Sequence, residues 1–354
     1  KEYAEPRKTE IVNEIDEIKI DVESMIPKET VLVVVSNEGY IKRVPSKSYN
    51  GSAGETLLKP GDYVKNIYET STLNNLVAFT NLGNYLFIPV YKIYEAKWKE
   101  LGKHISNLVP LQEGEYVISS FILRDEDALT IFTKQGMIKQ VLMKDLIVQR
   151  CSKPLVAMKL KDDDEVVSVK ISSEDVVMVT SNGYYLRFKN NEVPVVGPKA
   201  SGVKGMNLTD DSIISGECIN DSYEYLDIFT NNNTAKRIKL SELKYLTRAK
   251  KGTQLIKKTK TVTYKIVNSY ITNSKDIIII KKDSELTEIK NSDIAIMDLQ
   301  STGSSITKGY VDEYILKTNI IKCDFKKEEP IKEEKAEVKE KQVSFEDFTK
   351  DFKL

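Results

Sequence analysis

The chain has 354 residues, with 53 basic and 53 acidic side chains, one histidine, three cysteines and one tryptophan. A single histidine and cysteines without CxxC spacing give no pattern for a histidine-rich metal cluster, a zinc site or a Ser-His-Asp catalytic set. No stretch approaches the roughly 18 to 20 apolar residues of a membrane-spanning helix. The odd, scattered cysteines are typical of thiols in a reducing compartment.

The first segment, residues 1–29, is rich in charge and carries scattered Ile and Val. This composition predicts a linker, and Pro27 precedes the first long apolar run. Because the chain begins with Lys1 rather than Met, we expect it to be an internal or C-terminal piece of a longer protein.

From residue 30 onward one pattern occurs six times: an apolar run typical of a strand, a short polar turn with a pivot residue, and a second strand. The pivots are spaced by 44, 53, 47, 50 and 51 residues. A strand-rich repeat of this length predicts blades that stack on one another, because one small sheet cannot bury its own apolar faces. The runs are residues 31–35, 76–79, 129–132, 176–179, 225–229 and 277–280, and the pivots are Gly39, Gly83, Gly136, Gly183, Asn233 and Ser284.

A tight hairpin needs a residue with positive φ, which glycine adopts freely and asparagine tolerates better than most residues. Ser284 is therefore the weakest of the six pivots. The near-continuous Val and Ile runs indicate strands covered on both faces, and we expect two outer strands after each hairpin, such as residues 165–171 and 213–219. The sequence predicts an all-β fold of six blades, a propeller-like disc of repeats of about 50 residues over 30–322.

One insert, residues 96–104, looks helical and carries Trp98 beside the single histidine, His104. Since His104 has no histidine companion, we expect it to be structural or to face solvent.

The C-terminal segment differs in composition from the repeats. Residues 326–341 are nearly all Lys, Glu and Pro and predict disorder, so we expect residues 323–354 to be a charged, disordered tail. Near its end, Phe345, Phe348 and Phe352 would share one face of a helix. Two interpretations stay open for this aromatic motif: an unstructured terminus, or a short helix that docks into a groove on a partner.

The charge is unevenly distributed. Residues 1–29 carry 5 basic and 9 acidic side chains and residues 324–354 carry 8 and 10, which leaves 40 basic and 34 acidic side chains in between. Residues 236–260 hold ten Lys or Arg against Glu242, and residues 134–161 hold seven against Asp145. Such patches supply the sequence-independent phosphate contacts of DNA binding.

Basic residues also recur at the third and fourth positions after the pivots, as Lys42 and Arg43, Lys139, Arg187, and Lys236 and Arg237. Equivalent positions on successive blades predict a curved basic belt on the rim. The alternative for each residue is a solvated charge that protects an edge strand. Together with basic residues nearby, the candidate DNA-binding residues are Lys42, Arg43, Lys47, Lys139, Lys144, Arg187, Lys189, Lys204, Lys236, Arg237, Lys239, Lys244, Arg248, Lys250 and Lys251.

Several motifs are similar to a known family. They are ProArgLysThrGluIle at residues 6–11, MetIleProLysGlu at 25–29, GlyTyrIleLysArg at 39–43 with Ser48 and Tyr49, AsnTyrLeuPheIleProVal at 84–90 and TrpLysGluLeuGlyLysHis at 98–104. Residues 1–322 resemble the C-terminal domain of the A subunit of bacterial topoisomerase IV. The resemblance implies a β-pinwheel, in which blades exchange a strand with their neighbours, and which bends duplex DNA on a basic rim.

The related gyrase A subunits carry a glutamine-arginine-arginine-glycine-glycine box after the first blade. Here residues 50–54 read AsnGlySerAlaGly, without arginine, which favours topoisomerase IV and its ATP-dependent decatenation and relaxation during chromosome segregation. The resemblance also implies that the catalytic tyrosine, ATP and Mg²⁺ belong to other parts of the enzyme, so this fragment has no catalytic residue, cofactor or metal of its own. Implied partners are duplex DNA and the B subunit of topoisomerase IV, with a chromosome-organising complex as a further candidate, in a nucleoid-associated, cytoplasmic setting without a membrane.

Three alternatives remain open. A propeller-type protein-interaction scaffold would not need the basic register, although the recurring Gly-His and Trp-Asp pairs of WD40 blades are missing. A propeller enzyme would gather polar or metal-binding residues at a central channel. A gyrase A subunit that has lost its box would supercoil DNA in the reconstituted enzyme.

Overall fold

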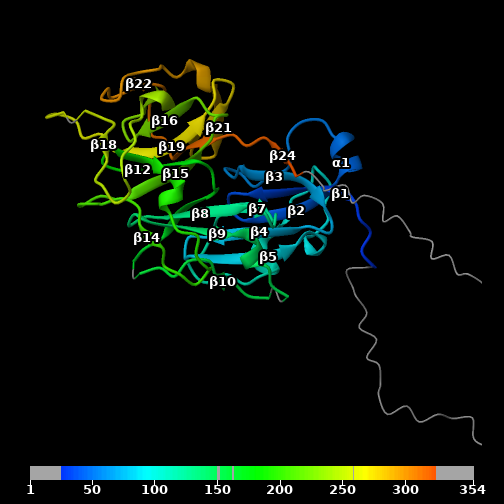
Figure 1. The fold of residues 1–354 in the computed structure, drawn as a ribbon. Coiled ribbons are helices and arrows are strands. Elements are labelled where there is room, and N and C mark those ends of the chain that lie inside the picture. Colours follow the sequence, from blue (N-terminus) through cyan, green and yellow to red (C-terminus); the bar gives the residue numbers. More distant parts are fainter. Residues whose placement is uncertain (1–24, 150–151, 162, 258, 324–354) are drawn as a thin grey trace, which may run out of the picture. The chain divides into compact units, whose positions relative to one another are not determined.

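The computed structural model describes residues 25–149, 152–161, 163–257 and 259–323. The described residues belong to one compact unit that ends at Cys323 and form six small, mainly antiparallel sheets (Figure 1). The expected all-β fold with six blades is confirmed. Residues 1–24 of the linker predicted for 1–29, and residues 324–354 of the predicted tail with its aromatic motif at Phe345, Phe348 and Phe352, lie outside the described residues.

Each sheet is built on a hairpin whose two strands correspond to the apolar run and the strand after its pivot. The first strands are β1 (Thr30–Ser36), β4 (Asn75–Thr80), β8 (Ala128–Thr133), β12 (Asp175–Thr180), β16 (Tyr225–Thr230) and β20 (Ile277–Lys282). The second strands are β2 (Tyr40–Pro45), β5 (Asn84–Pro89), β9 (Met137–Leu142), β13 (Tyr184–Lys189), β17 (Thr234–Lys239) and β21 (Glu285–Lys290).

A third strand pairs with the first strand of each hairpin, and third strands of successive sheets contact one another. Ser168 Oγ donates to Gly216 O at 2.6 Å and Tyr270 Oη to Tyr314 O at 2.7 Å, which joins neighbouring third strands. These strands, expected as outer ones, therefore lie at the edge where the sheets meet. They are β3 (Val64–Ser71), β7 (Val117–Ile122), β11 (Val166–Ile171), β15 (Ile213–Ile219), β19 (Ile266–Thr272) and β23 (Glu313–Leu316).

Neighbouring sheets exchange a short strand at the opposite edge. After each second strand from β5 onward, a single turn of 3-10 helix leads into a segment that crosses back and pairs with the second strand of the preceding sheet. The exchange expected for a β-pinwheel is thus confirmed. The crossing strands are β6 (Lys103–His104), β10 (Leu155–Val156), β14 (Val203–Lys204), β18 (Thr253–Gln254) and β22 (Ser304–Ser305); the 3-10 turns are η2 (Val90–Lys92), η4 (Met143–Leu146), η5 (Asn190–Glu192), η6 (Leu240–Glu242) and η7 (Asn291–Asp293), and η3 (Ile105–Asn107) follows β6.

The hydrophobic core consists of clusters that lie between consecutive sheets. On β4, Leu76 and Ala78 pack with the first sheet, whereas Val77 and Phe79 pack with the third. Each central strand is therefore buried on both faces, which explains why the apolar runs are nearly continuous rather than alternating. Between the sixth and first sheets the shared cluster is smaller and consists of Tyr63, Ile279 and Ile315.

The sixth sheet ends the exchange. Its described strands are β21, β20 and β23. No crossing strand from another repeat pairs with β21 in the described part of the chain, because the segment after β2 forms α1 (Ser46–Asn50) instead of a crossing strand. The sixth repeat contacts the first sheet through β24 (Ile320–Lys322), which pairs in parallel with β3 (Figure 1). Tyr63 Oη also donates to Glu313 Oε1 at 3.0 Å.

Two local predictions are wrong. The positive φ of the sixth turn, 51°, belongs to Asp283 rather than Ser284, because Lys282 pairs with Glu285 and leaves a turn shorter by one residue than the others. Aspartate tolerates this conformation through its short polar side chain. The insert at residues 96–104 is a turn followed by β6, and Trp98 is buried against the first sheet with Leu32 and Val44.

Four of the five crossing segments carry a glycine that lies against the preceding sheet. At Gly252, where φ is +85°, an added Cβ would lie 2.2 Å from the carbonyl oxygen of Tyr185. We therefore expect Gly252→Ala to lower the free energy of unfolding by about 3 kcal/mol, measured by urea denaturation. Gly197→Ala is the control, because nothing lies within 4 Å of its added Cβ; equal losses in both variants would contradict this packing.

Candidate nucleic-acid interface

The third residue after the pivot is a buried lysine in alternate sheets. Lys139 is 0% exposed, and its Nζ donates to Gly197 O at 2.9 Å and Pro198 O at 2.8 Å. Lys42 Nζ donates to Trp98 O at 2.9 Å and Glu100 O at 2.6 Å. In both cases the acceptors belong to the next crossing segment, so the ammonium group joins two sheets.

Lys236 follows the same pattern with more acceptors. Its Nζ donates to Asp298 O, Leu299 O and Ser301 O at 2.6 to 3.0 Å, and to Leu255 O at 2.7 Å. Burial lowers the pKa of Lys42, Lys139 and Lys236 to about 8, since desolvation disfavours a charged amine. The same position holds the buried Leu86 and Leu186 in the second and fourth sheets.

The fourth residue after the pivot caps the next 3-10 turn. Gln140 Nε2 donates to Asn190 O at 3.0 Å and to Val193 O at 2.8 Å. Arg237 Nε donates to Ile294 O at 2.7 Å. Such bonds satisfy carbonyl groups that the short helix leaves unpaired, and they bind each hairpin to its successor.

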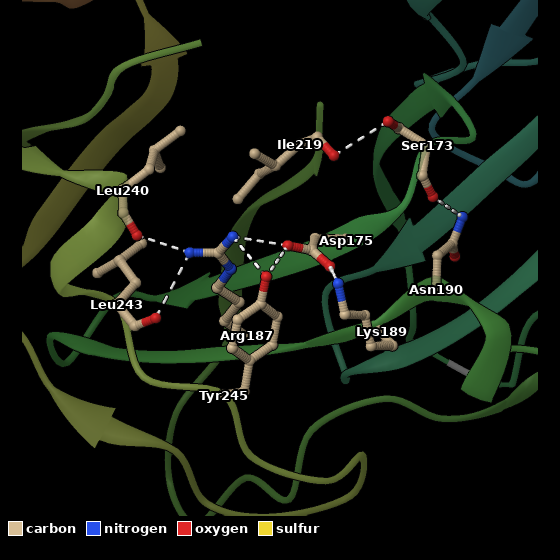
Figure 2. A network of polar contacts seen from close by, with 9 residues as sticks. All are labelled: Ser173, Asp175, Arg187, Lys189, Asn190, Ile219, Leu240, Leu243 and Tyr245. Atoms are coloured by element: carbon tan, nitrogen blue, oxygen red, sulfur yellow. Dashed lines mark hydrogen bonds and ion pairs between the residues drawn. The ribbon is translucent and has the colours of Figure 1, made fainter. Parts of the chain in front are cut away.

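Arg187 has the most extensive set of partners (Figure 2). Its guanidinium donates to Leu240 O at 2.6 Å and forms an ion pair with Asp175 Oδ2 at 2.6 Å. The Tyr245 hydroxyl also donates to Asp175 Oδ2, and Lys189 Nζ lies 2.8 Å from Asp175 Oδ1. Burial alone would raise the pKa of Asp175, but the hydrogen bonds from Lys189, Tyr245 and Arg187 hold it below its ordinary value.

The expectation that this register forms an exposed belt is therefore wrong for five residues. The side chains of Lys42, Lys139, Arg187, Lys236 and Arg237 are buried by the neighbouring sheet, and each donates hydrogen bonds to carbonyl, hydroxyl or carboxylate groups of the protein. Arg43 is mostly covered, with 16% of its side chain exposed, and pairs with Glu95 at 2.9 Å. The recurrence of these residues reflects the joining of sheets.

The other predicted residues lie at the surface. Lys144, Lys189 and Lys239 stand in or directly before a 3-10 turn, Lys47 is on α1, and Arg248 is half-buried. Lys204, and Lys244, Arg248, Lys250 and Lys251 of the fifth repeat, belong to the segments that cross back to the preceding sheet. The exposed members of the predicted set are Lys47, Lys144, Lys189, Lys204, Lys239, Lys244, Lys250 and Lys251.

The crossing segments form a surface that the sequence analysis predicted only in part, through Lys204, Lys244, Arg248, Lys250 and Lys251. These segments, residues 93–104, 147–149 with 152–156, 193–204, 243–254 and 294–305, lie at the sheet edge opposite the third strands. The first four carry exposed lysines, whereas the fifth has no Lys or Arg. A signal existed, because Gly102, Gly202, Gly252 and Gly303 recur ahead of four of the crossing strands. The exposed lysines added by the structure are Lys97, Lys99, Lys103, Lys153 and Lys199.

Three other kinds of feature are relevant to the described residues: a metal-binding cluster, a pocket and a membrane-spanning helix. Over the described ranges, no group of three or more His, Cys, Asp or Glu side chains could hold a metal ion. A groove of about 390 Å³ beside Asp175 is lined by charged, polar and apolar side chains, and its two cations, Arg187 and Lys189, already pair with that carboxylate. No helix in the described part of the chain is both long and apolar enough to span a bilayer.

One buried carboxyl gives the fold a pH dependence. Burial raises the pKa of Asp227 to about 7, although Thr272 Oγ1 donates to it at 2.8 Å. An unfolded aspartate titrates near 3.9. Between about pH 4 and 7 the Asp227 carboxyl is therefore protonated in the folded chain and ionised in the unfolded chain. The free energy of unfolding that this proton contributes is lost as the pH rises toward 7. Relative to Asp227→Asn, the wild-type free energy of unfolding should fall by about 1.4 kcal/mol per pH unit around pH 5 to 6.5. Parallel pH profiles of the two proteins in urea denaturation would contradict this.

Comparison with known proteins gives a consistent assignment. The model of the family described as DNA gyrase C-terminal domain, β-propeller, matches residues 30–65, 74–124, 127–173, 174–220 and 224–272. The match covers five of the six repeats, and the sixth is seen in the structure.

The similar proteins include several topoisomerase A subunits. The A subunit of DNA topoisomerase 4 from Bacillus subtilis is 34% identical over 312 residues, which cover 86% of this chain and 39% of that protein. The corresponding protein of Staphylococcus aureus (strain MRSA252) is 37% identical over 278 residues, 77% of this chain and 35% of that protein. The chain thus spans less than half the length of these relatives.

Solved structures agree with this fold. A crystal structure of the C-terminal domain of DNA topoisomerase IV has a TM-score of 0.78 and 34% identity, and the match covers 82% of this chain and 94% of that one. A DNA gyrase A C-terminal domain matches with a TM-score of 0.60 and 23% identity over 81% of this chain and 98% of that one, which supports the fold alone. The chain belongs to the DNA gyrase C-terminal domain β-propeller family, and over most of its length it is similar to the C-terminal part of the topoisomerase IV A subunit.

Proposed function

We propose that this chain binds and bends duplex DNA without reading its sequence, through the cations of its crossing segments. The observation that carries the proposal is the recurrence of exposed lysines on four successive crossing segments, all at the same sheet edge. Contacts from flexible lysines to phosphate are independent of sequence. Bending a stretch of 20 to 30 base pairs costs on the order of 1 to 6 kcal/mol, which several such contacts can offset.

In this proposal the chain is the non-catalytic C-terminal domain of the topoisomerase IV A subunit. It presents DNA segments to a catalytic core that lies elsewhere in the enzyme, together with the B subunit, ATP and Mg²⁺, for decatenation and relaxation at the nucleoid in the cytoplasm. The fifth-repeat segment, with Lys244, Lys250 and Lys251, is the strongest anchor. The last crossing segment, residues 294–305, adds no phosphate contact in the wild-type chain, because it carries Asp298 and no cation.

One structural feature favours topoisomerase IV over gyrase. The stretch at residues 50–54 has no arginine, and Trp98 Nε1 donates to Gly54 O at 2.9 Å. Lys42 Nζ donates to Thr56 Oγ1 just beyond it. The stretch is therefore held against the first sheet and offers no cation to DNA.

The test is a titration of two unrelated duplexes of equal length at several salt concentrations. We expect equal affinities and a steep, linear fall of log K with log salt, at a slope of about −0.9 per phosphate contact. Strong preference for one duplex, or no binding at low salt, would contradict the proposal. In a reconstituted enzyme with this C-terminal domain, decatenation without negative supercoiling would separate topoisomerase IV from gyrase.

A further inference from the structure

The three buried lysines lie under turns of one kind. The segments 97–100, 197–200 and 298–301 are each closed by a hydrogen bond from the fourth residue's N–H to the first residue's carbonyl, at 3.0 to 3.1 Å. Lys42, Lys139 and Lys236 bind two or three carbonyls of these turns. The ammonium groups thus fix the turns from beneath.

The residue at the third position of each turn is long, polar and exposed. It is Lys99 over Lys42, Lys199 over Lys139, and Gln300 over Lys236. Because the carbonyls on one or both sides of this residue are bound, its backbone has little freedom.

The fourth sheet shows what happens without a buried lysine. Leu186 occupies the equivalent position, and Ala249 in the crossing segment above it has a φ of +62°. The Ala249 N–H donates to Gly205 O at 2.7 Å. This sheet is complete all the same, so the fold does not require a lysine there, and burying an ammonium group opposes folding.

We propose that Lys42 and Lys139 are positioning residues for DNA binding: they hold the turns that present Lys99 and Lys199 to the phosphate backbone and do not touch DNA themselves. The inference rests on the proposed function. It explains why a buried cation recurs under the two turns whose third residue is an exposed lysine. Gln300 stands at the same position in a turn of the same kind, which Lys236 holds, but its side chain carries no positive charge.

The test is a double-mutant cycle of Lys139→Leu and Lys199→Ala, measured as duplex affinity against salt. Leucine is the matched choice because Leu86 and Leu186 occupy the equivalent positions. Each single variant is expected to weaken binding roughly three- to tenfold and to reduce the salt slope by about 0.9, and the double variant should be no worse than either one. Hydrogen exchange at the Ala200 amide should speed up in Lys139→Leu and stay unchanged in Lys199→Ala.

The outcomes separate the possible roles. Additive losses would overturn the inference, because Lys139 would then contact phosphate directly. A loss in Lys199→Ala with none in Lys139→Leu would overturn it too, while leaving the proposed function intact. If the wild-type chain does not bind DNA, the proposed function itself fails.

A gain-of-function variant gives a second test that does not depend on Lys139. Gln300→Lys should strengthen binding roughly three- to tenfold and steepen the salt slope by about 0.9, because it adds a cation to a fixed turn. In a Lys236→Leu background the gain should be lost. An equal gain in both backgrounds would overturn the positioning role.

Discussion

Reversal of Lys244, Lys250 and Lys251 to glutamate is expected to weaken duplex binding by about a hundredfold or more at low salt. All three side chains are exposed on one crossing segment, between η6 and β18. Each substitution removes one phosphate contact and adds a repulsive charge, so the salt slope should decrease by about 0.9 for each lysine that is reversed, or nearly 3 in total. Fluorescence anisotropy with a labelled duplex at four salt concentrations measures both quantities.

The matched control is the triple reversal of Lys275, Lys308 and Lys322. These lysines are exposed in the sixth repeat, outside the crossing segments, and their reversal changes the net charge by the same amount. The control variant should keep a salt slope close to the wild-type value. Equal losses in the two triple variants would mean that overall charge decides binding rather than the crossing segments.

Arg187→Met is expected to lower the free energy of unfolding by about 3 kcal/mol without removing a DNA contact. Loss of the guanidinium leaves the carbonyl of Leu240 without its donor and removes the ion pair from the buried Asp175 carboxylate, whose Oδ2 then keeps only the Tyr245 hydroxyl. Breaking a buried pair by removing one partner is strongly destabilising. Urea denaturation near pH 7 measures the loss.

The control for Arg187 is Lys189→Met, which removes a second cation from the same carboxylate. Half of the Lys189 side chain is exposed and solvent screens its charge, so we expect a much smaller loss than in Arg187→Met. A loss of similar size in both variants would show that the network does not depend on burial. A fall in DNA affinity that remains in the fully folded Arg187→Met protein would restore Arg187 to the candidate interface.

The repeat itself could be predicted from the sequence, because positive φ restricts the residue at each turn. Gly39, Gly83, Gly136 and Gly183 marked four hairpins correctly. In the sixth turn the left-handed residue is Asp283, one position before the predicted Ser284. The turn is one residue shorter than the others, and this changes which residue takes the left-handed conformation. Spacing alone does not show the length of a turn.

The candidate site was harder to predict because a lysine in a strand gives no indication of whether its end reaches solvent. Lys139 and Lys236 lie in strands that are buried by segments about 60 residues later in the chain. The crossing strands are only two residues long and no residue type is common to all five, so they carry no recognisable strand pattern. The recurring glycines before them were the available signal, and their meaning depends on a contact with the preceding sheet.

The most direct test of the account is a titration of the chain on duplexes of increasing length, with donor and acceptor dyes at the two ends of the longest duplex. We expect affinity to rise with length until the duplex spans all the cationic crossing segments, and energy transfer to increase as the bound DNA bends. The triple reversal of Lys244, Lys250 and Lys251 should abolish the bend at matched occupancy. Length-independent binding without bending would contradict the central claim that these crossing segments form a DNA-bending surface.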